Sequence, residues 1–200
     1  MEIDAALVKK LREMCGAGVM DCKMALQEAQ GDMEEALKIL RKKGMATAEK
    51  KAARATNEGV VDAYIHPGSK IGVLVEVDCE TDFVARNDEF KAFVHDLAMH
   101  IAAASPRWVR REDVPEDVKN SELEVYMAQA RQSGKPEAVV QKIAEGKLNK
   151  WFQSVVLLEQ EFVKDPEKTI EDLRREMVAK VGENIEIRRF ARFRVGEEAS

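Results

Sequence analysis

The hydrophobic period of the sequence changes near residue 80, and this change limits the folds that the chain can adopt. Before it, apolar side chains or cysteine occupy every second position from Ile71 to Cys79, which is the pattern of a half-buried β-strand. After it, apolar residues recur from Phe90 to Ile101 at the spacing of one helix face. The sequence therefore predicts a strand at 71–79 that turns directly into a helix at about 82–104.

The junction between these two elements is Thr81-Asp82-Phe83-Val84. Thr81 and Asp82 suit a helix N-cap, because their side-chain oxygens can accept the unpaired amide protons of the first turn. Phe83 then falls at a helix N-terminus on a strand-to-helix corner, which is an exposed place for a phenylalanine. The residues alone leave two interpretations open. Phe83 either staples the helix start to the core while Asp82 caps it, or it faces outward to bind a partner.

The N-terminal part of the chain predicts a small helical domain and a linker. Apolar residues at helical spacing predict three short amphipathic helices before Gly44, which is expected to end the third. Gly16 and Gly18 separate the first two helices, and Asp32 is placed to cap the third. The Ala-, Lys- and Glu-rich stretch 45–58 is expected to be a helical linker.

The remaining elements are two more strands, a helical hairpin and one further helix. A first strand is expected at 60–66, before the one at 71–79. Two antiparallel helices, 115–131 and a second one ending near 152, predict a hairpin that turns at Gly134-Lys135-Pro136. A further helix is expected to contain the residues from Ile170 to Val181. The final strand is expected to place on one face Ile185, Ile187, Ala191, Phe193 and Val195.

These elements predict the fold class and its parts. Because strands and helices segregate rather than alternate, we expect an α+β fold, with a small antiparallel sheet, helices on one face and a projecting helical hairpin. The expected parts are a three-helix domain with its linker (1–55), the first part of the core (56–105), the hairpin (106–152) and the second part of the core (153–200).

Composition excludes several classes of protein. The net charge of −5 and the pI of about 5.5 argue against direct binding of nucleic acid, which favours a basic surface. No apolar run is long enough to cross a membrane and the N-terminus lacks the features of a secretory signal, so we expect a cytoplasmic protein without membrane contact. Cys15, Cys22 and Cys79 are an odd number without a CxxC pair, which favours free thiols in a reducing cytosol.

No motif predicts an enzyme or a cofactor. The chain has no GxxxxGK[ST] loop, so it is not expected to bind GTP itself. The histidines show no metal-ligand spacing with the cysteines, and no serine motif suggests a catalytic triad. Glu76, Asp78 and Glu80 share one strand face and raise a metal-site hypothesis. They lack the loop and carbonyl ligands of a calcium site, so we expect them to steer a partner instead.

A basic stripe near the C-terminus raises an RNA-binding alternative. Arg188, Arg192 and Arg194 fall on one face of the last expected strand. Proteins that bind single strands stack bases on several aromatic side chains, whereas this face carries Phe190 alone. We therefore expect a solvated or dimer-facing surface.

Two motifs resemble the elongation factor Ts family, the guanine nucleotide exchange factors of elongation factor Tu. They are EVDCETDFVAR at 76–86 and LREMCGAGVMDCKMAL at 11–26. The resemblance continues through Ser133-Gly134-Lys135-Pro136 and Gly182-Glu183-Asn184-Ile185. The chain departs from the usual pattern of the family at Cys15, Met24 and Asp78.

The resemblance implies a function and a site. It implies that the chain promotes GDP release from elongation factor Tu by disturbing the partner's magnesium and phosphate contacts, with Asp82 and Phe83 docking near that magnesium. The resemblance also places the start of the second helix against the partner, with Met20 as the exposed contact. As residues at a helix start, Val19 and Met20 could instead fill the three-helix core, and at least one of them is expected to do so. The residues expected to bind the partner are Thr81, Asp82, Phe83, Val84, Val19 and Met20.

The resemblance also implies a ubiquitin-associated-like N-terminal domain and a dimer. Longer members of the family carry two copies of the core subdomain, and this chain has one. A homodimer that supplies the second copy is therefore expected, giving a complex with two copies of each protein. The alternative function is a non-catalytic adaptor, whose ubiquitin-associated-like domain and helical hairpin recruit partners without promoting exchange.

Overall fold

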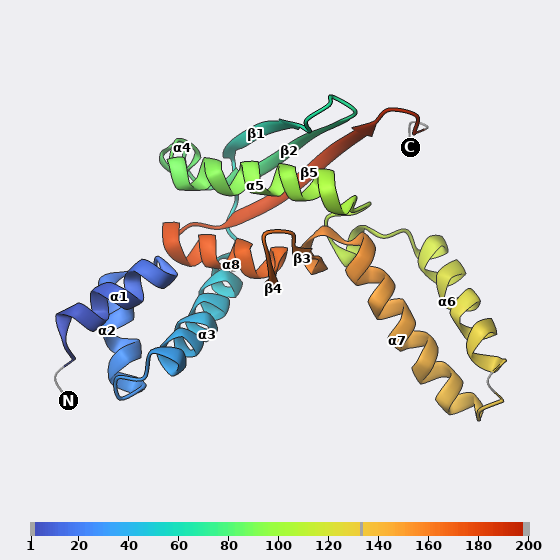
Figure 1. The fold of residues 1–200 in the computed structure, drawn as a ribbon, viewed down its shortest axis with the longest axis horizontal. Coiled ribbons are helices and arrows are strands. Elements are labelled where there is room, and N and C mark those ends of the chain that lie inside the picture. The colour runs from blue at the N-terminus through green and yellow to red at the C-terminus, as the bar shows by residue number, and fades with distance from the viewer. Residues whose placement is uncertain (1–2, 133, 198–200) are drawn as a thin grey trace. The chain divides into compact units, whose positions relative to one another are not determined.

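The computed structural model describes residues 3–132 and 134–197 and has the predicted α+β fold (Figure 1). The remaining positions, including Ser133 of the quoted hairpin turn and the ends of the first and last expected parts, lie outside the described residues. The α-helices are α1 (Ala5–Cys15), α2 (Val19–Glu28), α3 (Met33–Lys51), α4 (Asp82–Ala85), α5 (Asp88–Ala104), α6 (Glu116–Arg131), α7 (Glu137–Val155) and α8 (Ile170–Val181). The strands are β1 (Glu58–Ile65), β2 (Ile71–Cys79), β3 (Glu161–Phe162), β4 (Asp165–Thr169) and β5 (Ile185–Arg194). Single 3-10 turns are η1 (Arg111–Asp113) and η2 (Leu157–Glu159).

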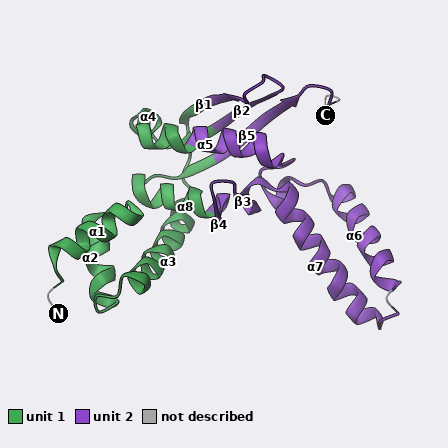
Figure 2. Cartoon of the chain, viewed as in Figure 1, with its two compact units in different colours: residues 1–60, 77–93, 172–186 green, residues 61–76, 94–171, 187–200 purple. Residues whose placement is uncertain are grey.

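The chain forms two compact units (Figure 2). The first comprises residues 1–60, 77–93 and 172–186, and the second comprises residues 61–76, 94–171 and 187–200. The division into four parts that the sequence suggested remains a prediction.

The first unit begins with three helices around a core, as predicted. Leu11 of α1, Leu26 of α2 and Ala36 of α3 are fully buried at their meeting point. Asp32 caps α3, because its Oδ1 accepts the amide of Glu35 at 2.9 Å.

Helix α3 does not end at Gly44, as the sequence predicted, but continues to Lys51. A glycine inside a helix costs only about 1 kcal/mol, and the buried Ala48 one turn later anchors the extension. A Cβ at Gly44 would lie 3.6 Å from the Cβ of Ala179 in α8, which is an ordinary van der Waals contact, so α8 lies beside this part of α3. The helical linker expected at 45–58 is therefore only partly helical, and the chain leaves α3 after Lys51.

Strands β1, β2 and β5 form a three-stranded sheet in the order β1-β2-β5. The alternation predicted for β2 is confirmed, because Val73, Val75 and Val77 are buried whereas Leu74 is exposed. One face of β2 therefore packs against the core, and the other remains open.

The faces predicted for β5 are only partly right. Ile185 and Ile187 are buried as expected, but Phe193 is 67% exposed and Val195, just beyond the strand, is 73% exposed. Arg192 instead turns inward and donates hydrogen bonds to the carbonyl of Ala102. The alternation shifts by one residue within the strand, and because side chains alternate with a period of two, such a shift exchanges the faces of all later residues.

The sequence reasoning missed a second, two-stranded sheet. β3 pairs with β4 in the antiparallel direction, with an irregular register. β3 has two residues and β4 contains Pro166, a residue type depleted from strands, so neither strand carries a visible alternation. The predicted antiparallel hairpin, by contrast, is present as α6 and α7 in the second unit, where Val140, Ala144 and Leu148 bury one face of α7.

Candidate partner-docking site

The predicted strand-to-helix corner is present, but its helix is one turn long. β2 ends at Cys79, and α4 covers Asp82–Ala85 only. A new helix starts because the Oδ1 of Asn87 accepts the amide of Glu89 at 2.7 Å, as an N-cap does. The single helix predicted at 82–104 is therefore wrong. The order Asn87-Asp88-Glu89, an N-cap residue followed by two acids, was the signal for this break.

Phe83 projects from this turn and is 84% exposed. It does not staple the helix to the core, so that interpretation is wrong. Val84 and Ala85 beside it are buried and hold the turn in place. Val84, which was expected to bind a partner, therefore supports the corner from inside, and at 8% exposure it offers little surface. Its contact with a partner stays a prediction. Because phenylalanine is among the residue types most often buried, an exposed one on a fixed corner is a candidate contact.

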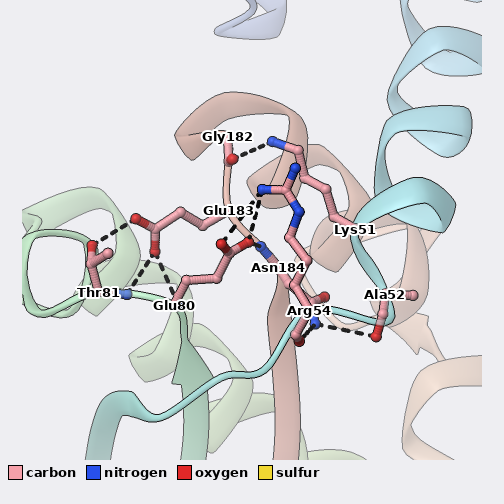
Figure 3. A network of polar contacts seen from close by, with 8 residues as sticks. All are labelled: Lys51, Ala52, Arg54, Glu80, Thr81, Gly182, Glu183 and Asn184. Atoms are coloured by element: carbon pink, nitrogen blue, oxygen red, sulfur yellow. Dashed lines mark hydrogen bonds and ion pairs between the residues drawn. The ribbon is translucent and has the colours of Figure 1, made fainter.

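Glu183, in the turn after α8, holds this corner (Figure 3). One carboxylate oxygen accepts the amide of Glu80 at 3.1 Å and the amide of Thr81 at 3.0 Å. The other oxygen accepts the Thr81 hydroxyl at 2.6 Å. Thr81 occupies the N-cap position of α4 but makes no side-chain capping bond, so its predicted capping role is wrong. Hydrogen bonds to a charged acceptor contribute about 1.5–3 kcal/mol each, so Glu183 stabilises the corner substantially.

Asn184 and Glu80 extend the network to the segment after α3 (Figure 3). The amide of Asn184 donates to the Glu80 carboxylate at 2.6 Å, and its buried side chain donates to the Arg54 carbonyl at 2.9 Å. The Arg54 guanidinium lies 3.5 Å from the same Glu80 carboxylate, and Lys51 donates to the Gly182 carbonyl. The end of α3, the end of β2 and the turn after α8 therefore meet at the corner.

The Cys79 thiol lies beneath the corner and donates to the Thr81 carbonyl at 3.2 Å. Burial, followed by the nearby Glu183 carboxylate, raises the pKa of Cys79 to about 11. The side chain is therefore a neutral thiol at neutral pH, and it adds another hydrogen bond to the backbone before α4.

Asp82 keeps its carboxylate at the surface beside Phe83. It forms an ion pair with Arg86 at 2.9 Å, one helical turn away, and both side chains are exposed. An exposed pair of this kind contributes at most about 1 kcal/mol, so it orients the two side chains without holding the turn together.

A second exposed segment lies at the start of α2. Val19 is 49% exposed and Met20 is 64% exposed, so neither fills the three-helix core, contrary to the expectation that at least one would. Gly16 precedes them with a φ of +66°, which glycine adopts without strain. Lys180 of α8 passes over this glycine, with its Cε 3.1 Å from where a Cβ would stand, and its Nζ pairs with Glu89 of α5 at 2.8 Å. Lys180 thus links the turn before α2 to the first turn of α5.

Two of the acidic residues predicted on one face of β2, Glu76 and Glu80, form ion pairs or hydrogen bonds within the chain. Glu76 forms an ion pair with Arg189, and Glu80 belongs to the network around Asn184. Within residues 3–132 and 134–197, no group of three or more His, Cys, Asp or Glu side chains could hold a metal ion. Over the same residues, no helix is long and apolar enough to cross a membrane.

The sequence reasoning missed the residues that support the corner from a distance. Glu183 and Asn184 lie in a string that was noted for its resemblance to the family, and that was their only signal. Lys180 carried none, because nothing in its local pattern separates it from other lysines on an exposed helix face.

The model of the family described as Elongation factor TS matches residues 4–173, which include both exposed segments. The chain belongs to the elongation factor Ts family. It is therefore a translation elongation factor, as the resemblance implied. The match covers α4 and the start of α2, so both exposed segments lie within the part of the chain that the family model matches.

Curated relatives named Elongation factor Ts agree over nearly the whole chain. The one from Geobacter sulfurreducens is 59% identical over 197 residues, covering 98% of this chain and 91% of the relative. The one from Carboxydothermus hydrogenoformans is 60% identical over 195 residues, covering 98% of this chain and 90% of the relative. The one from Thermotoga neapolitana is 58% identical over 198 residues, covering 99% of this chain and all of the relative.

Proposed function

We propose that this chain is a non-enzymatic guanine nucleotide exchange factor that acts on elongation factor Tu in the cytoplasm. The observation that carries the proposal is Phe83, 84% exposed on a corner that the Glu183 network holds in place. Asp82 and Phe83 make the main contact with the partner. Met20 and Val19 make a second one.

The physical basis is the role of Mg²⁺ in nucleotide binding. A bound Mg²⁺ bridges phosphate oxygens to the nucleotide-binding protein, so displacing the elements that support it weakens nucleotide affinity. Phe83 enters the partner near that ion, and burying its side chain stabilises the complex by about 1.5–3 kcal/mol. That energy offsets part of the distortion in the partner. The chain therefore needs neither a nucleophile nor a nucleotide site of its own.

Linkage sets how the exchange complex turns over. If binding of this chain lowers the affinity of the partner for GDP, GDP lowers the affinity of the partner for this chain by the same factor. Entry of GTP therefore releases the chain, and a small amount of it can serve many partner molecules. Turnover of this kind separates an exchange factor from a protein that only binds.

We further propose that the chain acts as a homodimer, joined through the open face of its three-stranded sheet. The apolar residues exposed on these strands or directly after β5 are Val61, Ile65, Leu74, Phe193 and Val195. An apolar surface shared by three neighbouring strands favours burial against an equal surface, and two copies related by a two-fold axis provide it. The complex with the partner then contains two copies of each protein.

A charged substitution at the centre of the open sheet face tests whether this face forms the dimer interface. Leu74 is exposed, so Leu74→Asp should fold, and we expect it to shift the chain from dimer to monomer in sedimentation equilibrium. Val125→Asp places the same charge at an exposed position of α6 and should leave the dimer intact. A wild-type chain that sediments as a monomer at all concentrations would contradict the dimer and leave the exchange proposal standing.

The exchange function is tested by release of fluorescent GDP from elongation factor Tu, with magnesium present and this chain substoichiometric. We expect accelerated release of more GDP than the chain present, because each copy acts repeatedly. Tight binding without acceleration would favour the adaptor instead. No binding would overturn both functions.

A further inference from the structure

Two thiols lie side by side where α1 meets α2. The Sγ atoms of Cys15 and Cys22 are 3.8 Å apart, and the Cys22 thiol also lies 3.7 Å from the carbonyl oxygen of Ala17. A disulfide bond is about 2.05 Å long, so the two sulfur atoms, now 3.8 Å apart, need to approach by about 1.8 Å. Both thiols are free.

The surroundings give the two cysteines different roles. Cys15 ends α1 and is partly exposed, so an oxidant in solution can reach it. Cys22 is fully buried, so it is shielded from the oxidant but next to Cys15. This is the arrangement of an accessible thiol with a resolving thiol beside it. Cys79, the third cysteine, donates to the Thr81 carbonyl and has neither role.

We propose that Cys15 and Cys22 form a reversible disulfide in response to peroxide and that this bond switches the docking segment at the start of α2. Hydrogen peroxide oxidises the Cys15 thiol to a sulfenic acid, as its O–O bond breaks and one water leaves. The Cys22 sulfur then attacks the Cys15 sulfur, forming the S–S bond and releasing the second water. The two thiols together lose two hydrogen atoms, and a dithiol restores them.

Burial of Cys22 controls the speed of the second step. Burial, followed by the neighbouring Cys15, raises the pKa of Cys22 to about 11. The attacking form is the thiolate, which is scarce at neutral pH, so closure is slow there. Its rate should rise about tenfold per pH unit below that pKa, because the thiolate fraction rises by this factor. This makes the pair a sensor of sustained rather than brief exposure to peroxide.

The effect on function rests on the proposed exchange activity. The ring closed by the bond contains Gly16 to Asp21, and therefore Val19 and Met20, the exposed residues of the second contact. Drawing the end of α1 toward α2 displaces this segment. A displacement on the order of 1 Å in a positioned site can cost a factor of 10 or more, so we expect exchange to slow about tenfold on oxidation.

The bond itself is tested by mass spectrometry of the full-length chain after treatment with hydrogen peroxide, alkylation and digestion with trypsin. Both cysteines fall in the peptide from Glu13 to Lys23, which has no internal Lys or Arg. We expect this peptide to lose the mass of two hydrogen atoms and to escape alkylation, and dithiothreitol to reverse both changes. Oxidation of Met14 or Met20 adds oxygen and is distinguished by mass. A peptide alkylated at both cysteines after peroxide treatment would overturn the proposal.

The switch is tested by GDP release with the same samples. Oxidised wild type should be about tenfold slower than reduced wild type and should recover with dithiothreitol, which does not repair methionine sulfoxide. Cys15→Ser, given the same peroxide, keeps both methionines and should retain its rate. A disulfide that forms without slowing exchange would overturn the switch alone. Absence of exchange by the reduced wild type would overturn the proposed function, and the bond would still be measured independently.

Discussion

The hydroxyl of Thr81 donates to the carboxylate of Glu183 at 2.6 Å, although the two residues are 102 positions apart. The same carboxylate accepts the amides of Glu80 and Thr81. The strand-to-helix corner is therefore held by the turn after α8, because α4 has no side-chain cap of its own. A one-turn helix supported in this way can present Phe83 to a partner at a fixed position.

Removing the Glu183 carboxylate should loosen this corner. Glu183→Ala leaves partly buried donors unpaired, so we expect the free energy of unfolding to fall by about 2 kcal/mol. Glu183→Gln keeps one acceptor oxygen and should lose about 1 kcal/mol. Urea unfolding followed by circular dichroism measures both. Glu13→Ala, which removes an exposed carboxylate from α1, is the control. Equal stability of Glu183→Ala and wild type would contradict the role of the network.

Substitution by alanine at two glycines, Gly59 and Gly146, should change the free energy of unfolding in opposite directions. A Cβ at Gly59 would lie 2.5 Å from the Val77 carbonyl oxygen and 2.8 Å from the Asp78 Cα, so Gly59→Ala forces β1 from β2 and should cost about 2 kcal/mol or more. A Cβ at Gly146, inside α7, meets nothing within 4 Å. Gly146→Ala should therefore raise the unfolding free energy by about 0.5–1 kcal/mol. Thermal unfolding that moves both variants in the same direction would contradict these contacts.

Buried His100 should make stability depend on pH. Its Nδ1 accepts the amide of Val163 at 3.4 Å, so Nε2 carries the proton and donates to the Gln160 oxygen at 3.0 Å. Burial lowers the pKa of His100 below its usual value of 6.5, and the Gln160 bond opposes this shift only in part. Below about pH 6.5 the unfolded chain therefore binds more protons than the folded chain, and the stability present above that pH is lost as pH falls.

A histidine variant isolates this contribution. We expect the unfolding free energy of the wild type to fall between pH 7 and pH 5 more steeply than that of His100→Gln, by at most about 1.4 kcal/mol per pH unit. Carboxylates elsewhere titrate in both proteins, so they cancel in the difference. Identical pH profiles from urea unfolding would contradict a neutral His100 in the core.

The elements that the sequence predicted well are those with a local signal. Alternation along β2 and the helical spacing after Asp88 depend only on neighbouring residues, and both reflect burial of one face. The shift within β5 has no such signal, because Arg192 turns inward to reach the Ala102 carbonyl, a contact between distant segments. The hydrogen bonds that Glu183 accepts at the corner also join distant segments of the chain. Local patterns predicted the strand-to-helix corner that carries Phe83. Long-range hydrogen bonds, which have no local signal, stabilise that corner.

The extension of α3 beyond Gly44 shows a second limit of local rules. Glycine after a basic turn is a common helix end, but its cost of about 1 kcal/mol is small beside the packing of the helix that follows. Ala48 is buried and Lys51 donates to the Gly182 carbonyl, so the extra turns are stabilised by tertiary contacts. Those same contacts bring α3 to the corner network.

The role of Phe83 in exchange is measured by comparing GDP release from elongation factor Tu in the presence of wild type, Phe83→Ala and Val125→Ala. Phe83 and Val125 are both exposed, so both variants should fold with the stability of the wild type. Loss of about 1.5–3 kcal/mol of burial in the complex predicts release that is about 10- to 150-fold slower with Phe83→Ala and unchanged with Val125→Ala. Exchange by Phe83→Ala at the wild-type rate would contradict the claim that this side chain drives nucleotide release.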